Sequence, residues 1–189
     1  MSDITTLDAS QRWRRIAGSF TERVDAVPTA AWSNPTPCEN WVALDVVKHL
    51  VEWVPPFLNT GTGLQLAAGP DVTADPPGAW RHLNDQIIAL LDTPDIDTRT
   101  FDHPQAGQHP LGQAIERFIL GDVLIHTWDL SRATGQDEHL DPDMVNEMLA
   151  GLEPIADVLV QSGHYGHRTP TPTTADDQTK LLALTGRNP

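Results

Sequence analysis

The sequence contains one cysteine, Cys38, among its 189 residues. Disulfide frameworks and cysteine-based structural zinc sites each need several cysteines, so the composition excludes both. Basic residues are also scarce, because 12 Lys and Arg stand against 26 Asp and Glu and the formal net charge is −14. Nucleic-acid-binding proteins need a basic footprint, and anionic membranes attract basic segments. Both kinds of partner are therefore disfavoured.

Long hydrophobic runs are missing as well. No apolar stretch is long enough to span a bilayer, and residues 1–6 have neither the basic nor the apolar region of a signal peptide. We therefore expect a protein of the reducing cytoplasm. A hydrophobic fraction of 39% and a charged fraction of 20% are typical of a folded globular protein. The length predicts a single domain, residues 1–189, with a substantial core.

Helical periodicity dominates the chain, because apolar residues recur at steps of three and four. Prolines and a glycine are expected to end several helices. Pro28 should end the first helix, Pro55 and Pro56 the second, and Gly135 the fourth. Pro154 should kink the fifth helix. The predicted helices span about residues 8–27, 43–54, 78–91, 111–133, 142–160 and 175–184.

The connections between these helices are long. Residues 59–78 read as a loop, and residues 93–110 form an irregular stretch in which a short hairpin is possible. No segment has the sustained alternation that a sheet requires. The expected fold class is therefore all-α, a helical bundle with long crossover loops and a short extra C-terminal helix.

An acid and an imidazole interrupt the apolar stripe of the predicted helix 111–133. His126 follows Asp122 by four residues, so the two side chains lie one turn apart on the same face. A carboxylate in an apolar stripe is costly unless it is paired or bound to a cation. A metal ion such as Zn²⁺ would satisfy both side chains. A plain Asp–His ion pair, or an aspartate facing solvent, would explain the same spacing.

A third ligand is available on another helix. His49 lies on the semi-apolar side of the predicted helix 43–54. The pair His164 and His167 has a metal-like spacing, but its segment precedes a Pro/Thr-rich linker and is read as two exposed histidines.

Three segments carry a resemblance to a known family: residues 36–50 (TPCENWVALDVVKHL), residues 122–135 (DVLIHTWDLSRATG) and the ending LLALTGRNP. Together they resemble the DinB-like superfamily. More closely, they are similar to the metal-binding domain of mycothiol-dependent maleylpyruvate isomerase and its small actinobacterial relatives. The resemblance covers essentially the whole chain, residues 1–189.

The resemblance implies a DinB-like four-helix bundle that holds a divalent metal, usually Zn²⁺, through His49, Asp122 and His126. The isomerase carries glutamate where this chain has Asp122, so the metal would sit nearer this helix or bind more weakly. The isomerase also has a separate C-terminal domain, for which this length leaves no room. Mycothiol is the implied co-substrate. The oligomeric state considered is a homodimer.

Three ligands leave a coordination position open, which is the catalytic pattern for zinc. The metal could present a small thiol as thiolate to a small electrophile, the use that the resemblance favours. It could instead activate water, with Glu52 as the candidate base. A metal-binding or ligand-binding module without turnover, or a dimerisation domain that has lost its metal, are the non-enzymatic alternatives.

The neighbouring residues receive supporting roles. Asp129 lies seven residues after Asp122 and is expected to orient His126 without binding metal. Cys38 is expected to be a structural thiol. The rings of Trp41, Trp53 and Trp128 are candidates to line the substrate cleft, or else belong to the core.

Overall fold

The structure is a computed structural model of the chain that describes residues 4–156, 160 and 166–189. Its helical content confirms the expected all-α class, and the sheet that the described residues form is a two-stranded hairpin. The α-helices are α1 (Ala9–Asp25), α2 (Ala43–Thr62), α3 (Pro76–Leu91), α4 (Leu111–Ala114), α5 (Gly121–Thr134), α6 (Pro142–Leu152) and α8 (Asp177–Leu184). The hairpin strands are β1 (Thr100–His103) and β2 (Gly107–Pro110), and the shorter turns are η1 (Ile4–Thr6), η2 (Thr29–Ser33), η3 (Ile115–Leu120) and η4 (Glu153–Ile155).

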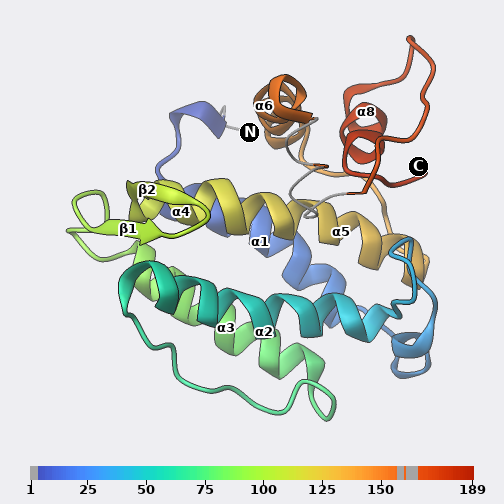
Figure 1. Cartoon of the computed structure of the whole chain (residues 1–189). Helices are drawn as coiled ribbons and strands as arrows, with labels where there is room; N and C mark the ends of the chain where they lie inside the picture. Colours follow the sequence, from blue (N-terminus) through green and yellow to red (C-terminus); the bar gives the residue numbers. More distant parts are fainter. Residues whose placement is uncertain (1–3, 157–159, 161–165) are drawn as a thin grey trace.

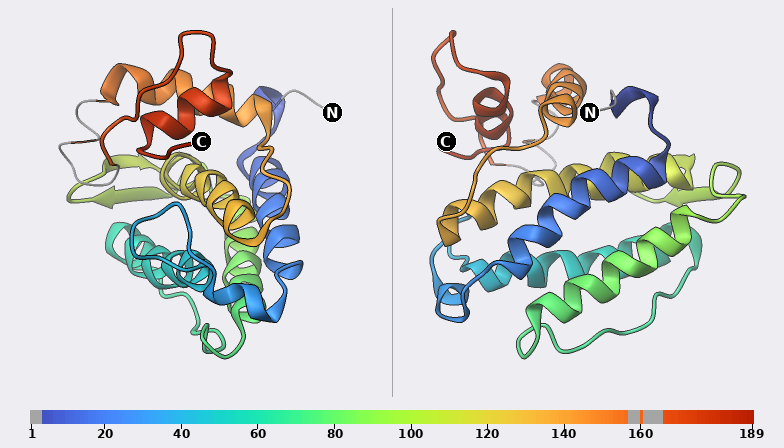
Figure 2. Two further views of the ribbon diagram at one scale, coloured as in Figure 1. Left: turned by 90° about the vertical axis from the view of Figure 1, so that its right-hand side faces the viewer. Right: turned by 180° about the vertical axis from the view of Figure 1, so that it is seen from behind.

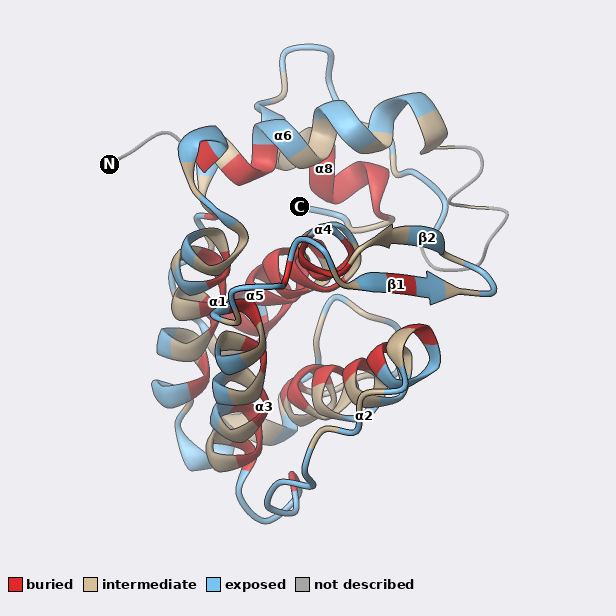
Figure 3. Ribbon diagram, turned by 90° about the vertical axis from the view of Figure 1, so that its left-hand side faces the viewer, coloured by how far each residue is buried: buried red, intermediate tan, exposed pale blue. Residues whose placement is uncertain are grey.

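Four helices form the bundle. Helices α1 and α2 each pack against both α3 and α5, so the four enclose one core (Figures 1 and 2). Helices α6 and α8 pack on each other and lie on one side of the bundle, beyond α5 (Figure 1). Buried residues face inward from all four bundle helices (Figure 3). The largest side chains of this core are those of Trp13, Phe20, Trp80 and Trp128.

Several predicted boundaries are confirmed by their caps. Asp8 accepts a hydrogen bond from the Gln11 backbone N–H and starts α1. Gly135 takes the left-handed conformation with φ 70° and ends α5, as the sequence predicts. Asp176 caps α8, which lies within the predicted terminal helix.

The predicted end of the second helix is wrong, because α2 continues through Pro55 and Pro56 to Thr62. Each proline removes a backbone hydrogen bond, at a cost of about 3 kcal/mol. The prolines lie on the outer side, and Pro56 is exposed, whereas Val54, Leu58 and Gly61 are buried. Continuing the helix keeps this apolar face in the core, and that burial offsets the lost bonds.

Gly61 fixes how the hairpin docks on the end of α2. A Cβ built at this position would lie 2.2 Å from a ring carbon of Phe101, which is fully buried on β1. The hairpin, which the sequence left open, pairs Phe101 with His109 and His103 with Gly107 in an antiparallel register. The close approach of glycine and ring lets β1 pack directly against α2.

The predicted helix 111–133 is divided into three parts. A short α-helical segment, α4, leads into a π-helical turn, η3, and then into α5. A wider turn inside an α-helix shifts the faces before and after it relative to each other. The face that continues into α5 carries Asp122 and His126.

The predicted fifth helix is interrupted at Pro154. Helix α6 ends at Leu152, Pro154 lies in the 3₁₀ turn η4, and Ala156 and Val160 are again helical. Residues 157–159 of the predicted helix lie outside the described residues. Within the described part of the chain, no helix combines the length and apolarity that a membrane crossing requires.

Candidate metal centre

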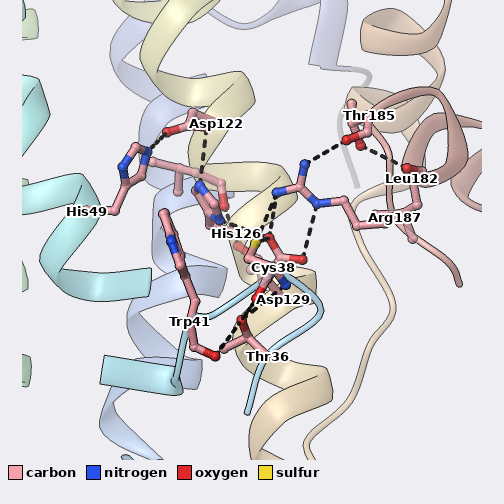
Figure 4. A network of polar contacts seen from close by, with 12 residues as sticks. Thr36, Cys38, Trp41, His49, Asp122, His126, Asp129, Leu182, Thr185 and Arg187 are labelled. Carbon is pink, nitrogen blue, oxygen red and sulfur yellow. Dashed lines mark hydrogen bonds and ion pairs between the residues drawn. The ribbon is translucent and has the colours of Figure 1, made fainter. Parts of the chain in front are cut away.

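Neighbouring helices bring three potential ligands together, as the sequence predicts. His49 projects from α2, and Asp122 and His126 project from α5 (Figure 4). His49 Nε2 lies 3.1 Å from Asp122 Oδ2, and His126 Nε2 lies 3.4 Å from Asp122 Oδ1. Each of the three residues offers one potential metal-ligand atom, and these three atoms all lie within 4.8 Å of one another.

The spacing of these atoms fits a small divalent cation. Two zinc ligands at about 2.1 Å and at a tetrahedral angle lie about 3.4 Å apart. The two contacts of Asp122, made by different carboxylate oxygens at 3.1 and 3.4 Å, are close to that separation. The donor set of two imidazoles and one carboxylate is also one that zinc accepts. Because the three atoms come from two helices held by the core, the fit is preorganised by packing.

The cluster is buried on one side and open on the other. The side chain of His126 is 5% exposed, whereas those of His49 and Asp122 are 32% and 19% exposed. Burial acts to raise the pKa of Asp122, but the imidazoles of His126 and His49 outweigh it and hold that pKa below its usual value. The carboxylate is therefore ionised, and a ligand can reach it from the His49 side.

Asp129 fixes the orientation of His126. Its Oδ2 lies 2.9 Å from His126 Nδ1, and its side chain is fully buried. In a neutral imidazole this contact places the proton on Nδ1 and leaves the lone pair of Nε2 facing Asp122. Two acceptors then face each other across 3.4 Å. A cation, either a proton or a metal ion, is needed between them.

Two further residues join the cluster from distant parts of the chain. Arg187 Nη2 donates to Asp129 Oδ2 at 2.7 Å, and Cys38 Sγ lies 3.4 Å from the same oxygen (Figure 4). Neither contact is predicted by the sequence. Arg187 is 58 positions from Asp129 and Cys38 is 91 positions away, and no periodicity or motif spacing connects such distant residues.

Cys38 is held as a thiol. Its burial, together with the charge of Asp129, raises the pKa of Cys38 to about 12. Cys38, His126 and Asp129 form a second group that could hold an ion, but the guanidinium of Arg187 already contacts both Cys38 and Asp129. The thiolate is the reactive form of cysteine, so the geometry agrees with a structural role.

Two tryptophan rings lie against the cluster. Trp41 stacks on His126 with ring centroids 5.7 Å apart and lies 5.1 Å from the ring of His49. Trp53 Nε1 donates to Asp122 Oδ2 at 3.1 Å. Trp128 is 1% exposed and its ring is covered by Arg132, so it belongs to the core.

Glu52, the candidate base for hydrolysis, lies on the outer flank of α2. Its side chain is 59% exposed and approaches Lys48 to 3.9 Å. His167 is exposed, and its predicted partner His164 lies outside the described residues.

Comparison with known proteins identifies the family. The sequence profile of the mycothiol maleylpyruvate isomerase N-terminal domain matches residues 13–131, which is more than half of the chain. The chain belongs to this family. The match contains all three residues of the candidate metal centre, and it agrees with the DinB-like resemblance of the sequence motifs.

Two relatives and one solved structure extend the comparison. Two uncharacterized proteins of Mycobacterium tuberculosis, from strains CDC 1551 / Oshkosh and ATCC 25618 / H37Rv, are each 27% identical over 186 residues. These alignments cover 96% of this chain and 98% of each relative. The crystal structure of a mutant of mycothiol-dependent maleylpyruvate isomerase aligns with a TM-score of 0.49 and 16% identity, over 89% of this chain and 77% of that chain.

Proposed function

We propose that the protein binds one divalent metal ion, Zn²⁺ by preference, through His49, Asp122 and His126, and uses it to transfer a small thiol onto an electrophile. The observation that supports the metal site is the convergence of one potential ligand atom from each of the three residues, with His126 Nε2 3.4 Å from Asp122 Oδ1 and His126 Nδ1 2.9 Å from Asp129 Oδ2. The family is named for mycothiol, which supports mycothiol as the thiol.

Thiol transfer needs a deprotonated sulfur and a binding surface that keeps water away from the electrophile. When bound, Zn²⁺ would supply the positive charge that keeps a coordinated thiol deprotonated at neutral pH. His126 and Asp122 form the buried side of the site, so a thiol would enter beside the more exposed His49. Three protein ligands leave room for it.

A row of aromatic rings leads away from the site and suits an apolar electrophile. Trp53 contacts His49 at a centroid distance of 5.9 Å and Phe57 at 5.1 Å, and Phe57 contacts Phe118 at 5.8 Å. All three of these aromatic side chains are partly exposed. In the transfer, the thiolate would attack the electrophilic carbon of an unsaturated substrate held against these rings. The C–S bond would form as the carbon–carbon π bond opens, and the resulting carbanion would take up a proton from water.

Hydrolysis is the second candidate reaction, but its base is poorly placed. Glu52 points to the exposed flank of α2 and pairs with Lys48, whereas the open side of the cluster is lined by Trp41 and Trp53. A metal-binding module without turnover would use the same three ligands. These alternatives differ from thiol transfer in whether a thiol is consumed.

The test of thiol transfer is direct. Zinc-loaded protein incubated with mycothiol and a panel of aromatic and unsaturated electrophiles is expected to accelerate adduct formation, because the site raises the thiolate fraction and holds both reactants. Adducts are followed by mass spectrometry, with His126→Ala as the matched control for metal-independent reaction. Cleavage of an ester or amide without thiol consumption would instead support the hydrolase. Metal binding without either reaction would support the binding module.

Asp129 is expected to support the site without binding the metal. Asp129→Asn keeps the size of the side chain but removes the charge that fixes Nδ1–H of His126. We expect a loss of metal affinity of about 10–100-fold, which is typical of outer-shell changes. Chelator competition measures the change. A loss as complete as that of His126→Ala would make Asp129 a ligand.

A further inference from the structure

A salt bridge from the C-terminal segment lies on the buried side of the candidate metal centre. Arg187 follows α8, and its side chain reaches Asp129 with two contacts, Nε to Oδ1 at 3.3 Å and Nη2 to Oδ2 at 2.7 Å. The Asp129 side chain is 0% exposed and that of Arg187 is 12% exposed. This pair is therefore a buried, two-pronged ion pair, the geometry in which an arginine fixes a carboxylate most firmly.

The backbone of the segment is held so that Arg187 can reach the site. Gly186 has φ 88° and lies against Gly166, where a Cβ would come within 2.8 Å of the neighbouring Cα. The backbone N–H of Arg187 donates to Leu182 O, and its carbonyl accepts from Thr169 Oγ1. The turn after α8 is thus anchored from both sides, and it directs the guanidinium at α5 (Figure 4).

The guanidinium has little capacity left for a ligand. Besides its two contacts with Asp129, Nη1 donates to Thr185 O at 3.0 Å and Nη2 lies 3.6 Å from Cys38 Sγ. A guanidinium has five N–H donors, and four are engaged. Arg187 is consequently arranged to hold Asp129, and not to receive a substrate anion.

We propose that Arg187 is a positioning residue for the metal centre, acting through Asp129 on His126. Asp129 Oδ2 accepts from both Arg187 Nη2 and His126 Nδ1. Arg187 neutralises and immobilises this carboxylate, so the imidazole stays in the Nδ1–H tautomer with Nε2 directed at Asp122. The proposal rests on the metal site of the proposed function, but the tautomer of His126 is measurable without metal.

The experiment compares Arg187→Met with Arg187→Lys and with Arg168→Met. Methionine has a similar length without charge, and lysine keeps the charge but loses the fork. Arg168 pairs with Glu153 in the same C-terminal region, so Arg168→Met controls for the loss of an ion pair there. The readouts are Zn²⁺ affinity by chelator competition, the absorption spectrum of the Co²⁺ form, and the ¹⁵N shifts of His126 in metal-free protein.

Arg187→Met is expected to weaken Zn²⁺ binding by about 10-fold or more, to change the Co²⁺ spectrum and to shift His126 away from the Nδ1–H tautomer. Arg187→Lys should restore part of the affinity, and Arg168→Met should bind like the unmodified protein. In the Asp129→Asn background, Arg187→Met should add little, because both changes break the same chain of contacts.

Unchanged affinity, spectrum and tautomer in Arg187→Met would overturn the proposal, even if the variant melts at a lower temperature. Fully additive losses in the double variant would overturn it as well. If the unmodified protein binds no metal, the proposed function fails, and the ¹⁵N shifts still decide whether Arg187 sets the tautomer of His126.

Discussion

Metal binding is expected to disappear when either candidate histidine ligand is replaced by alanine. His126→Ala removes the buried donor whose Nε2 faces Asp122 Oδ1 at 3.4 Å, and His49→Ala removes the donor from the opposing helix. Two remaining ligands cannot close a tetrahedral site, so affinity should fall by far more than the roughly 100-fold upper range of outer-shell changes. Elemental analysis of the purified variants, together with chelator competition, measures the loss.

His139→Ala is the matched control for these two variants. His139 Nδ1 contacts Asp137 Oδ1, and its side chain is 92% exposed, so it presents an Asp–His pair without burial. This variant should keep full metal occupancy. A His126→Ala protein that retains one tightly bound metal per chain would refute the assignment of the site.

The largest loss of stability is expected from Trp80→Ala. The Trp80 side chain is fully buried between α1 and α3, meets Phe20 edge-on at a centroid distance of 4.6 Å and donates from Nε1 to Thr21 Oγ1 at 2.8 Å. Truncating a core tryptophan leaves a cavity and costs about 3–5 kcal/mol. Thermal and denaturant unfolding of the metal-free protein measures this cost.

Two variants separate the contributions at Trp80. Trp80→Phe keeps most of the ring and loses the hydrogen bond to Thr21, so it should cost less than the alanine variant. Trp32→Ala removes a tryptophan that is only partly buried on η2, and its effect should be the smallest of the three. Equal destabilisation by Trp32→Ala and Trp80→Ala would contradict the view that burial decides the cost.

Most of the helices, and the placement of Asp122 and His126 on one helix face, could be predicted because their signals are local. The apolar spacing placed α1, α3 and α8, and Asp122 and His126 are only four residues apart. The course of α2 could not be predicted, since local rules end a helix at Pro55. Burial of Leu58 and Gly61 against the rest of the fold overrides that rule. Such burial depends on tertiary packing that a single segment does not encode.

The contacts of Arg187 and Cys38 with Asp129 could not be predicted from the sequence, because they too depend on tertiary packing. Asp129 could be proposed from its position on the helix that carries His126. Arg187 and Cys38 meet it only after the C-terminal segment and the loop before α2 have folded onto α5. Their partners are set by the three-dimensional path of the chain, and a lone arginine or cysteine in the sequence does not reveal it.

The π-helical turn η3 makes the site sensitive to the number of residues before it. Each residue of an α-helix turns the chain by about 100°, and the wide turn over Ile115–Leu120 accommodates an additional residue between α4 and α5. Deleting one residue there would allow a uniform α-helix and keep the segment's hydrophobic composition. With α4 fixed, it would rotate Asp122 and His126 away from His49. A one-residue deletion in this turn is therefore a route by which a homologue could keep the bundle and lose the clustering of the three side chains.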